Sequence, residues 1–300
     1  MAKNRDIDLE RSAYAESMTA HANDLRDEGI YKEMASVLCG AGCFDVEHPV
    51  HVDCGCGPGD LLIALANSLR GKSGRCDLIG VDTNSVLIAE VRRKAEAIGI
   101  PTIVHDRTQL KQGVTKATRG KFDRRYLEDA EALGQIAKRR EGLNLILVAD
   151  DLREGSVFRA VSKKIGSDIS SMSYTFPGIS GDMILEGAVD LPDEEIAPRA
   201  NNLRLELTSA IRKLAQSGLR PGGYFFQAER VPSSNKLSEI ANAFLTLMKN
   251  YGSFDLKDSR TIFGDLVPLL ERSSLKFTAK ISLGQPETLR LDSFLFEKTD

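Results

Sequence analysis

The stretch Val50-His51-Val52-Asp53-Cys54-Gly55-Cys56-Gly57-Pro58-Gly59-Asp60-Leu61 decides how the rest of the chain is organised. Val50 and Val52 alternate with their neighbours as strand residues do, and an apolar run begins at Leu61 as a buried helix would. The glycines between them allow the backbone to approach a ligand closely, and the N–H groups of a helix start point at such a ligand. The stretch therefore predicts a strand, a ligand-binding turn and a helix.

The spacing of the glycines indicates the kind of ligand. Gly55, Gly57 and Gly59 form a G-x-G-x-G run preceded by an acid, whereas dinucleotide enzymes use G-x-G-x-x-G. This run resembles motif I of the class I S-adenosylmethionine-dependent methyltransferases, whose glycine loop bends around the methionine part of the cofactor. The resemblance implies that S-adenosyl-L-methionine is the cofactor. The loop residues it places at the cofactor are Asp53, Cys54, Gly55, Cys56, Gly57 and Gly59.

A second acid ends the next predicted strand, since Cys76 to Val81 is apolar in character and is followed by Asp82. A carboxylate accepts two hydrogen bonds at once and therefore suits the vicinal diol of a ribose. An acid at this place also occurs in dinucleotide folds, so it supports an adenosine-type ligand without choosing the cofactor. In the resembled family, such an acid binds the ribose, which implies this role for Asp82 and a neighbouring place for Thr83.

A third similarity, Leu219 to Phe226, resembles the family's turn into the fifth strand. Together the three imply an α/β fold, the three-layer Rossmann-like methyltransferase fold, with a mostly parallel seven-stranded sheet and an antiparallel last strand. We expect an N-terminal helical cap over residues 1–44 and a cofactor-binding domain over residues 45–300. A helical insertion is expected near residues 101–142, and Leu275 to Leu283 with Leu289 to Phe296 is expected to form the final strand pair.

Two segments compete for the third strand of this sheet. Thr102 to Asp106 is short and follows a proline, whereas Leu143 to Ala149 is a longer apolar run. We prefer the second segment, which makes Ser167 to Phe176 the fourth strand. With the other register, Asp106 would be the acid that ends strand three.

The resemblance also implies where adenine and the methyl acceptor lie. In the family, an acid after strand three often holds the adenine amino group, which points to Asp150 or Asp151. The acceptor lies at the end of strand four, under N-terminal helices, which points to Tyr174, Phe176 and Tyr14. The weaker candidates His21, His51, His105 and Glu229 are not assigned as a base, because methyl transfer from a sulfonium works mainly by holding the acceptor at near-attack distance.

Composition bounds the remaining possibilities. With 300 residues and 42% hydrophobic content, the chain can bury a substantial core. No apolar run reaches the length of a membrane span and the first residues are too charged for a signal peptide, so we expect a cytoplasmic protein without membrane contact. The five cysteines are bunched and lack the C-x-x-C spacing of structural zinc sites, so we expect reduced thiols and no metal.

The charge distribution bears on the partner. Net charge is -3, Asp182 to Glu195 is acidic, and Arg107 to Arg140 is basic. An acidic loop beside the pocket would repel a phosphate backbone, so we expect a small-molecule acceptor rather than nucleic acid. Two alternatives stay open: an RNA (tRNA) methyltransferase that uses the basic insertion, and a non-catalytic cofactor-binding module. The sequence does not determine the oligomeric state.

Overall fold

The structure is a computed structural model that describes residues 15–16, 18–20, 22–106, 142–149, 169–175, 215–216, 218–231, 274–284 and 290–299. Its helices are α2 (Ile30–Gly40), α3 (Asp60–Ser68) and α4 (Ser85–Ala97). Its strands are β1 (Val50–Cys54), β2 (Cys76–Asp82), β3 (Thr102–Asp106), β4 (Leu143–Ala149), β5 (Ile169–Thr175), β6 (Leu219–Val231), β7 (Leu275–Leu283) and β8 (Arg290–Lys298). Within these residues, no helix is long and apolar enough to cross a membrane.

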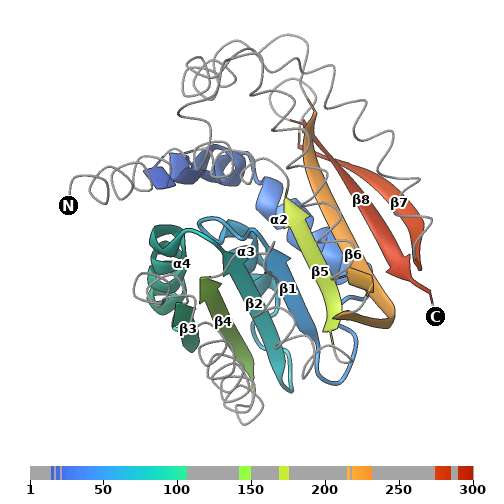
Figure 1. Ribbon diagram of the computed structural model, residues 1–300, viewed down its shortest axis with the longest axis horizontal. Coiled ribbons are helices and arrows are strands. Elements are labelled where there is room, and N and C mark those ends of the chain that lie inside the picture. The colour runs from blue at the N-terminus through green and yellow to red at the C-terminus, as the bar shows by residue number, and fades with distance from the viewer. Residues whose placement is uncertain are drawn as a thin grey trace, which may run out of the picture.

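All eight strands form one sheet in the order β3-β4-β2-β1-β5-β6-β8-β7 (Figure 1). The neighbours from β3 to β6 pair in parallel, and β8 runs antiparallel to both β6 and β7. This is the mostly parallel sheet of the Rossmann-like methyltransferase fold, with the antiparallel last strand that the sequence predicts.

The pairing resolves the two candidates for the third strand. β4 pairs with β2 along its whole length, from Cys76 opposite Leu143 to Asp82 opposite Ala149, and β5 pairs with β1. The preferred register is therefore confirmed. The expected number of seven strands is wrong, because the β-branched run of β3 pairs with β4 and adds an eighth strand at the edge. The insertion expected near 101–142 thus begins with a strand, and residues 107–141 lie outside the described part.

Three helices cover one face of the sheet, and their apolar sides share a single core with the strands (Figure 1). In α2 and α3 the apolar positions recur at helical spacing, so one side of each helix is buried. The core residues of α2 and α3 are Ile30, Met34, Ala35, Leu38, Leu61, Leu62, Leu65 and Ala66. Although α2 falls within the expected N-terminal cap, it packs as part of this helix layer; the cap boundary at residue 44 stays a prediction.

A β-bulge interrupts the pairing of β1 with β5. Val50 lies opposite Ile169 and His51 lies opposite Ser171, so Ser170 is an extra residue in β5. Its hydroxyl accepts from the Val50 N–H (3.1 Å) and donates to the Val50 carbonyl (3.0 Å), which replaces ladder hydrogen bonds at this point. Gly223 of β6 packs beside the bulge, where an added Cβ would lie 3.2 Å from the Ser170 carbonyl oxygen. Beyond the bulge, β5 continues in regular pairing with β1.

Candidate functional site

The candidate site lies where the strand order reverses. The strand β2, which follows β1 in the chain, is the neighbour of β1 in one direction within the sheet. The later strand β5 is the neighbour of β1 in the other direction. In open α/β sheets, ligands bind outside the carboxyl ends of the strands at such a switch point. Cys54, the last residue of β1, and the glycine loop that follows it lie at this point.

The glycine loop is closely packed at Gly59, its last glycine, and less closely packed at Gly57. Gly59 has a φ of 75° and an added Cβ there would lie 2.5 Å from the Val91 Cγ1 atom of α4, so both backbone and packing require glycine. At Gly57, where φ is 52°, an added Cβ would meet no atom of the described residues within 4 Å. The middle of the loop is therefore the part that a ligand can approach.

The backbone N–H groups of the loop already have acceptors within the protein. Those of Gly55 and Cys56 donate to the Val81 carbonyl (2.8 and 3.0 Å), and that of Gly59 donates to the Cys56 carbonyl (2.9 Å). The Gly57 N–H donates to Asp82 Oδ2 at 2.8 Å. Since these donors are in use, they are not arranged as an anion-binding cradle.

Asp82 ends β2 and faces the loop, as the sequence predicts. Besides the bond from Gly57, its Oδ1 atom accepts from the Asn84 N–H at 2.9 Å. Asn84, which follows Thr83, caps α4 by accepting from the Val86 N–H at 3.0 Å. Two backbone donors thus fix the orientation of the Asp82 carboxylate beside the loop.

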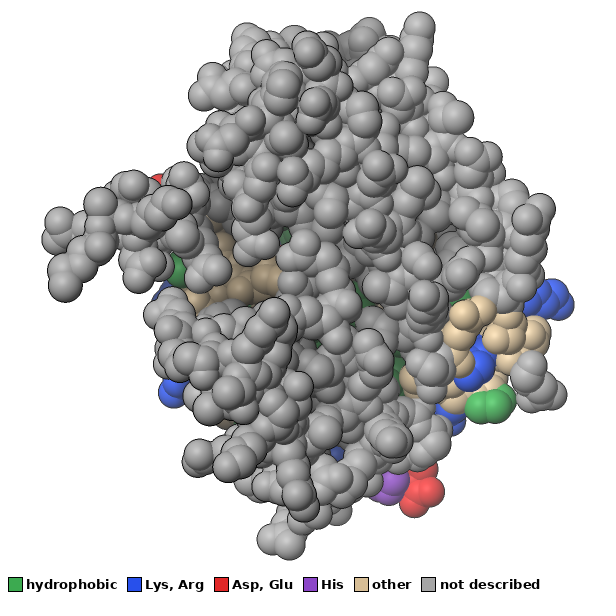
Figure 2. Space-filling view, in the orientation of Figure 1, with side chains coloured by type: hydrophobic (Ala, Val, Ile, Leu, Met, Phe, Trp, Pro, Cys, Tyr) green, Lys and Arg blue, Asp and Glu red, His purple; other side chains and the backbone are tan. Residues whose placement is uncertain are grey.

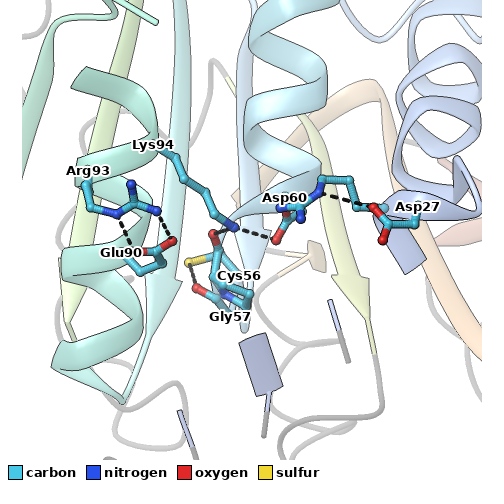
Figure 3. Close-up of polar contacts among 9 residues, drawn as sticks. Asp27, Cys56, Gly57, Asp60, Glu90, Arg93 and Lys94 are labelled. Atoms are coloured by element: carbon cyan, nitrogen blue, oxygen red, sulfur yellow. Dashed lines mark hydrogen bonds and ion pairs between the residues drawn. The ribbon is translucent and has the colours of Figure 1, made fainter. Parts of the chain in front are cut away.

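A buried acid at the start of α3 is paired with two cations from other elements. Asp60 accepts from Lys94 of α4 (2.7 Å) and from Arg26 of the preceding segment (3.3 Å). Lys94 also donates to the Pro58 carbonyl at 2.9 Å, so one side chain holds both the loop and the helix start (Figure 3). The helical residues 22–27 pass beyond the carboxyl ends of the parallel strands (Figure 1), and Arg26 ties them to the loop region.

Asp53, the motif I acid, is buried and has a different environment. Its Oδ1 atom accepts from the Ser173 hydroxyl of β5 at 2.7 Å. Among the residues that the structure describes, no Lys or Arg forms an ion pair with it. Burial, opposed by the hydrogen bond from Ser173 and assisted by the charge of Asp82, raises the pKa of Asp53 to about 7. A carboxyl group that titrates near neutral pH in a buried position is typical of a functional site.

Two thiols and a phenol complete the surroundings of the loop. Burial raises the pKa of Cys54 and Cys56 well above the usual range, so both thiols stay protonated. Tyr31 of α2 has its pKa raised by burial and then by the charges of Asp60 and Asp53. As protonated thiols, the two cysteines expected at the cofactor are not nucleophiles near neutral pH.

The remaining predicted site residues fall at the edge of the described part or outside it. Asp150 and Asp151 follow directly after β4 but are outside the described residues, as are Tyr14 and Phe176. Tyr174 lies in β5 opposite Cys54. Its role and those of the other four stay predictions. Asp106 ends the edge strand β3, separated from β2 by β4.

Several residues of the site were not predicted from the sequence. Tyr31, Arg26 and Lys94 come from three different segments and lack a motif of their own; Ser173 begins the stretch expected at the acceptor, but its hydrogen bond to Asp53 was not foreseen. The signal for Ser173 was available, since alternating serines follow the same period of two as His51 and Asp53 on the neighbouring strand. Arg26 and Lys94 carried no comparable signal.

In the described part of the chain, the basic side chains form separate groups on the face seen in Figure 2, at its right and left margins. The basic segment expected to face RNA, residues 107–140, lies outside the described part.

Comparisons with known proteins concern the fold. No family model and no curated protein matches the chain. Solved structures that match include a protein of Methanococcus maripaludis assigned as an S-adenosyl-L-methionine-dependent methyltransferase, with 11% identity, coverage of 95% of this chain and 94% of that one, and a TM-score of 0.46. The N-methyltransferase NodS from Bradyrhizobium japonicum, in complex with S-adenosyl-L-homocysteine, matches with 11% identity, coverage of 92% and 91%, and a TM-score of 0.43.

A protein of Listeria monocytogenes assigned as a class I S-adenosylmethionine-dependent methyltransferase matches with 14% identity, coverage of 90% of this chain and 59% of that one, and a TM-score of 0.43. These matches are similarities of backbone fold at low sequence identity.

Proposed function

We propose that the protein binds S-adenosyl-L-methionine and transfers its methyl group to a small-molecule acceptor. One observation supports this most directly: the loop N–H groups are occupied by protein acceptors, while the carboxylates of Asp53 and Asp82 lie beside the same loop. The N–H groups of Gly55, Cys56, Gly57 and Gly59 are therefore not available to an anion, and two carboxylates lie beside them.

This charge distribution discriminates between adenosine-type cofactors. A pyrophosphate needs backbone donors and tolerates anions poorly, because like charges brought together cost several kcal/mol. S-adenosyl-L-methionine has a ribose and an adenine but no phosphate, and its sulfonium and ammonium groups are positive. Asp82 would accept the ribose hydroxyls, and the negative charge of Asp53 would favour the cationic part of the cofactor.

The bound cofactor supplies an already activated methyl group, so the protein has mainly to hold the acceptor in line with it and exclude water. Asp150 or Asp151 would contact adenine, and Tyr14, Tyr174 and Phe176 would contact the acceptor. No residue is proposed as a catalytic base.

Calorimetric titration tests the cofactor assignment. We expect S-adenosyl-L-methionine and S-adenosyl-L-homocysteine to bind and the dinucleotide NAD not to bind. Asp82→Ala should weaken binding by about 1–3 kcal/mol, because a hydrogen bond to a charged group is lost. Asp45→Ala, at an exposed acid, serves as the control. Equal affinities of Asp82→Ala and the parent would show that the ribose assignment is wrong.

Transfer assays test the acceptor. With labelled S-adenosyl-L-methionine, we expect no methyl incorporation into bulk tRNA and no tight tRNA binding at low salt. Tight binding that falls steeply with added salt, together with methyl incorporation into the RNA, would replace the small-molecule proposal by the RNA alternative. Cofactor binding without transfer to any acceptor from a panel of small amines, phenols and carboxylates would favour the non-catalytic module.

A further inference from the structure

A continuous row of buried polar side chains crosses from β1 to β5 beneath the loop. His51 lies opposite Ser171 and Asp53 lies opposite Ser173, so all four share one face of the sheet. The His51 Nδ1 atom is 2.9 Å from the Ser171 Oγ atom, and its Nε2 atom is 3.0 Å from the Ser173 Oγ atom. Elsewhere this face is largely apolar, and each of these four residues is at most 3% exposed.

The chemistry of the groups fixes the direction of these hydrogen bonds. When Asp53 is ionised, Ser173 donates its one hydroxyl hydrogen to the carboxylate and therefore accepts from His51 Nε2–H. Burial lowers the pKa of His51 to about 3, so the ring is neutral and its Nδ1 atom accepts from the Ser171 hydroxyl. The donors of the row then run in one direction, from Ser171 through His51 and Ser173 to Asp53.

We infer that His51 and Ser173 are positioning residues for Asp53: the neutral, Nε2-protonated imidazole obliges Ser173 to point its hydrogen at the Asp53 carboxylate and so favours the anionic form of this acid. The inference rests on the proposed function, because it gives the row a purpose only if Asp53 faces a cationic cofactor. It assigns a role in the cofactor site to two side chains that are fully buried.

Other groups around Asp53 act in the opposite sense. Asp82 at the end of β2 and the desolvation of the site both favour the neutral acid. Tyr31 from α2 and the thiols of Cys54 and Cys56 interact with Asp53 electrostatically but stay protonated near neutral pH. Among these described neighbours, Ser173 is the one whose hydrogen bond favours the anion.

The first experiment measures the pH midpoint of the Asp53 carboxyl by ¹³C NMR in the cofactor-free protein. Ser173→Ala should raise this midpoint by about one pH unit, since a donor to the charged form is lost. His51→Phe should raise it by less, because Ser173 keeps its hydrogen but loses the donor that orients it. A matched control is Asn144→Ala, in which a buried donor on β4 to a buried acid on β2, Asp77, is removed.

A merely structural role predicts that Ser173→Ala and Asn144→Ala lower stability but leave the Asp53 midpoint equal to that of the parent. Such a result would overturn the inference. Long-range ¹H–¹⁵N spectra of the histidine rings give an independent measure at pH 8. We expect the Nε2–H tautomer for His51 in the parent, and the Nδ1–H tautomer would contradict the assigned direction.

Binding of S-adenosyl-L-methionine against pH separates this inference from the proposed function. The pH at which affinity is half-maximal should rise with the Asp53 midpoint in Ser173→Ala and stay in place in Asn144→Ala. A shifted NMR midpoint with no cofactor binding in any variant would contradict the proposed function while the control of Asp53 by Ser173 stands. Binding with a pH dependence identical in Ser173→Ala and the parent would contradict the positioning role.

Discussion

Asp53 and Asp77 are both buried acids, on the neighbouring strands β1 and β2, and each accepts a hydrogen bond from the next strand outward. Their surroundings differ in one respect. Asp77, near the amino end of its strand, forms an ion pair with Arg75. Asp53, near the carboxyl end, has the Ser173 hydroxyl but no ion pair with a described basic residue.

The difference separates an acid that is paired with a cation from one that, among the described residues, accepts only a hydroxyl hydrogen bond. Buried charges are normally paired, since desolvation of an isolated charge is costly. At Asp77 the protein supplies the opposite charge itself. At Asp53 the cost is reflected in a pKa near 7, and a cationic ligand would offset it. The same sheet therefore holds a buried acid with an ion pair at one end. At the other end it holds a buried acid that forms no ion pair with a described basic residue.

The largest expected effect comes from neutralising the two acids in turn. Asp77→Asn should lower the free energy of unfolding by about 3 kcal/mol, because it leaves the largely buried Arg75 without its partner. Asp53→Asn leaves no described cation behind and removes a desolvated charge, so stability at pH 8 should be unchanged or higher. Urea denaturation of both variants at pH 8 measures this, and similar losses in both would remove the distinction drawn between the two ends.

The next effect concerns pH. In the folded state the pKa of Asp53 rises from 3.8 to about 7, so this acid makes stability fall as pH rises between these values. The pKa of His51 falls from 6.5 to about 3, so this imidazole makes stability rise with pH over nearly the same window. Between pH 4 and 6.5 the two contributions oppose each other at about 1.4 kcal/mol per pH unit each.

When one of the two groups is removed, the free energy of unfolding should therefore depend on pH through the other group alone. The two single variants should show pH dependences of opposite sign. Asp53→Asn should make stability rise with pH between 4 and 6.5, and His51→Phe should make it fall. Thermal or urea unfolding at half-unit pH steps provides the measurement, with the exposed His48→Asn as control. Slopes of the same sign in both variants would show that the two groups do not titrate as described.

Cofactor affinity should distinguish the same two acids. Asp53→Asn should weaken binding of S-adenosyl-L-methionine at pH 8 by about 1–3 kcal/mol, because a charge-assisted contact is lost. Asp77→Asn, at the opposite end of its strand, should bind as the parent does once it is folded. Circular dichroism first shows whether both variants are folded. Calorimetry then compares their affinities for S-adenosyl-L-methionine with that of the parent. Equal weakening would place the ligand elsewhere.

The smallest expected effect is a loss of stability at the ion pairs of Asp60. This acid is paired with two cations, whereas Asp77 is paired with one. Arg26 is about half exposed and Lys94 remains when it is removed, so Arg26→Met should cost no more than about 1 kcal/mol. Lys94→Met should cost more, because that ion pair is largely buried and also holds the Pro58 carbonyl. Urea denaturation midpoints of the two variants test which one loses more stability. A larger loss of stability for Arg26→Met than for Lys94→Met would contradict the prediction.

Local patterns were sufficient to predict the central part of the fold. The alternation in β1, the glycine run and the apolar helix positions after it are all contained in twenty residues, and α3 begins within one residue of its expected start. The strand β3 was missed as a member of the sheet because a five-residue run after a proline does not reveal whether it pairs. Its place at the edge depends on β4, about forty residues later in the chain.

The candidate site was predictable where a motif carried it and not where contacts between distant segments did. Asp53 and Asp82 follow from their positions after strands. Lys94 meets Asp60 only because Gly59 lets α3 and α4 approach closely, and Arg26 meets it only through the path of the preceding segment. Such contacts depend on packing, which a single sequence does not specify.

The extra residue in β5 has a consequence for how the chain can change length in evolution. A deletion of Ser170 would close the bulge and still leave Ser171 opposite His51 and Ser173 opposite Asp53. A deletion of Met172 would instead make the two serines adjacent and turn one of them to the other face. Related chains should therefore tolerate gains and losses of a residue at the bulge, whereas the two-residue spacing of the serines should be inherited together with the histidine and the acid that they face.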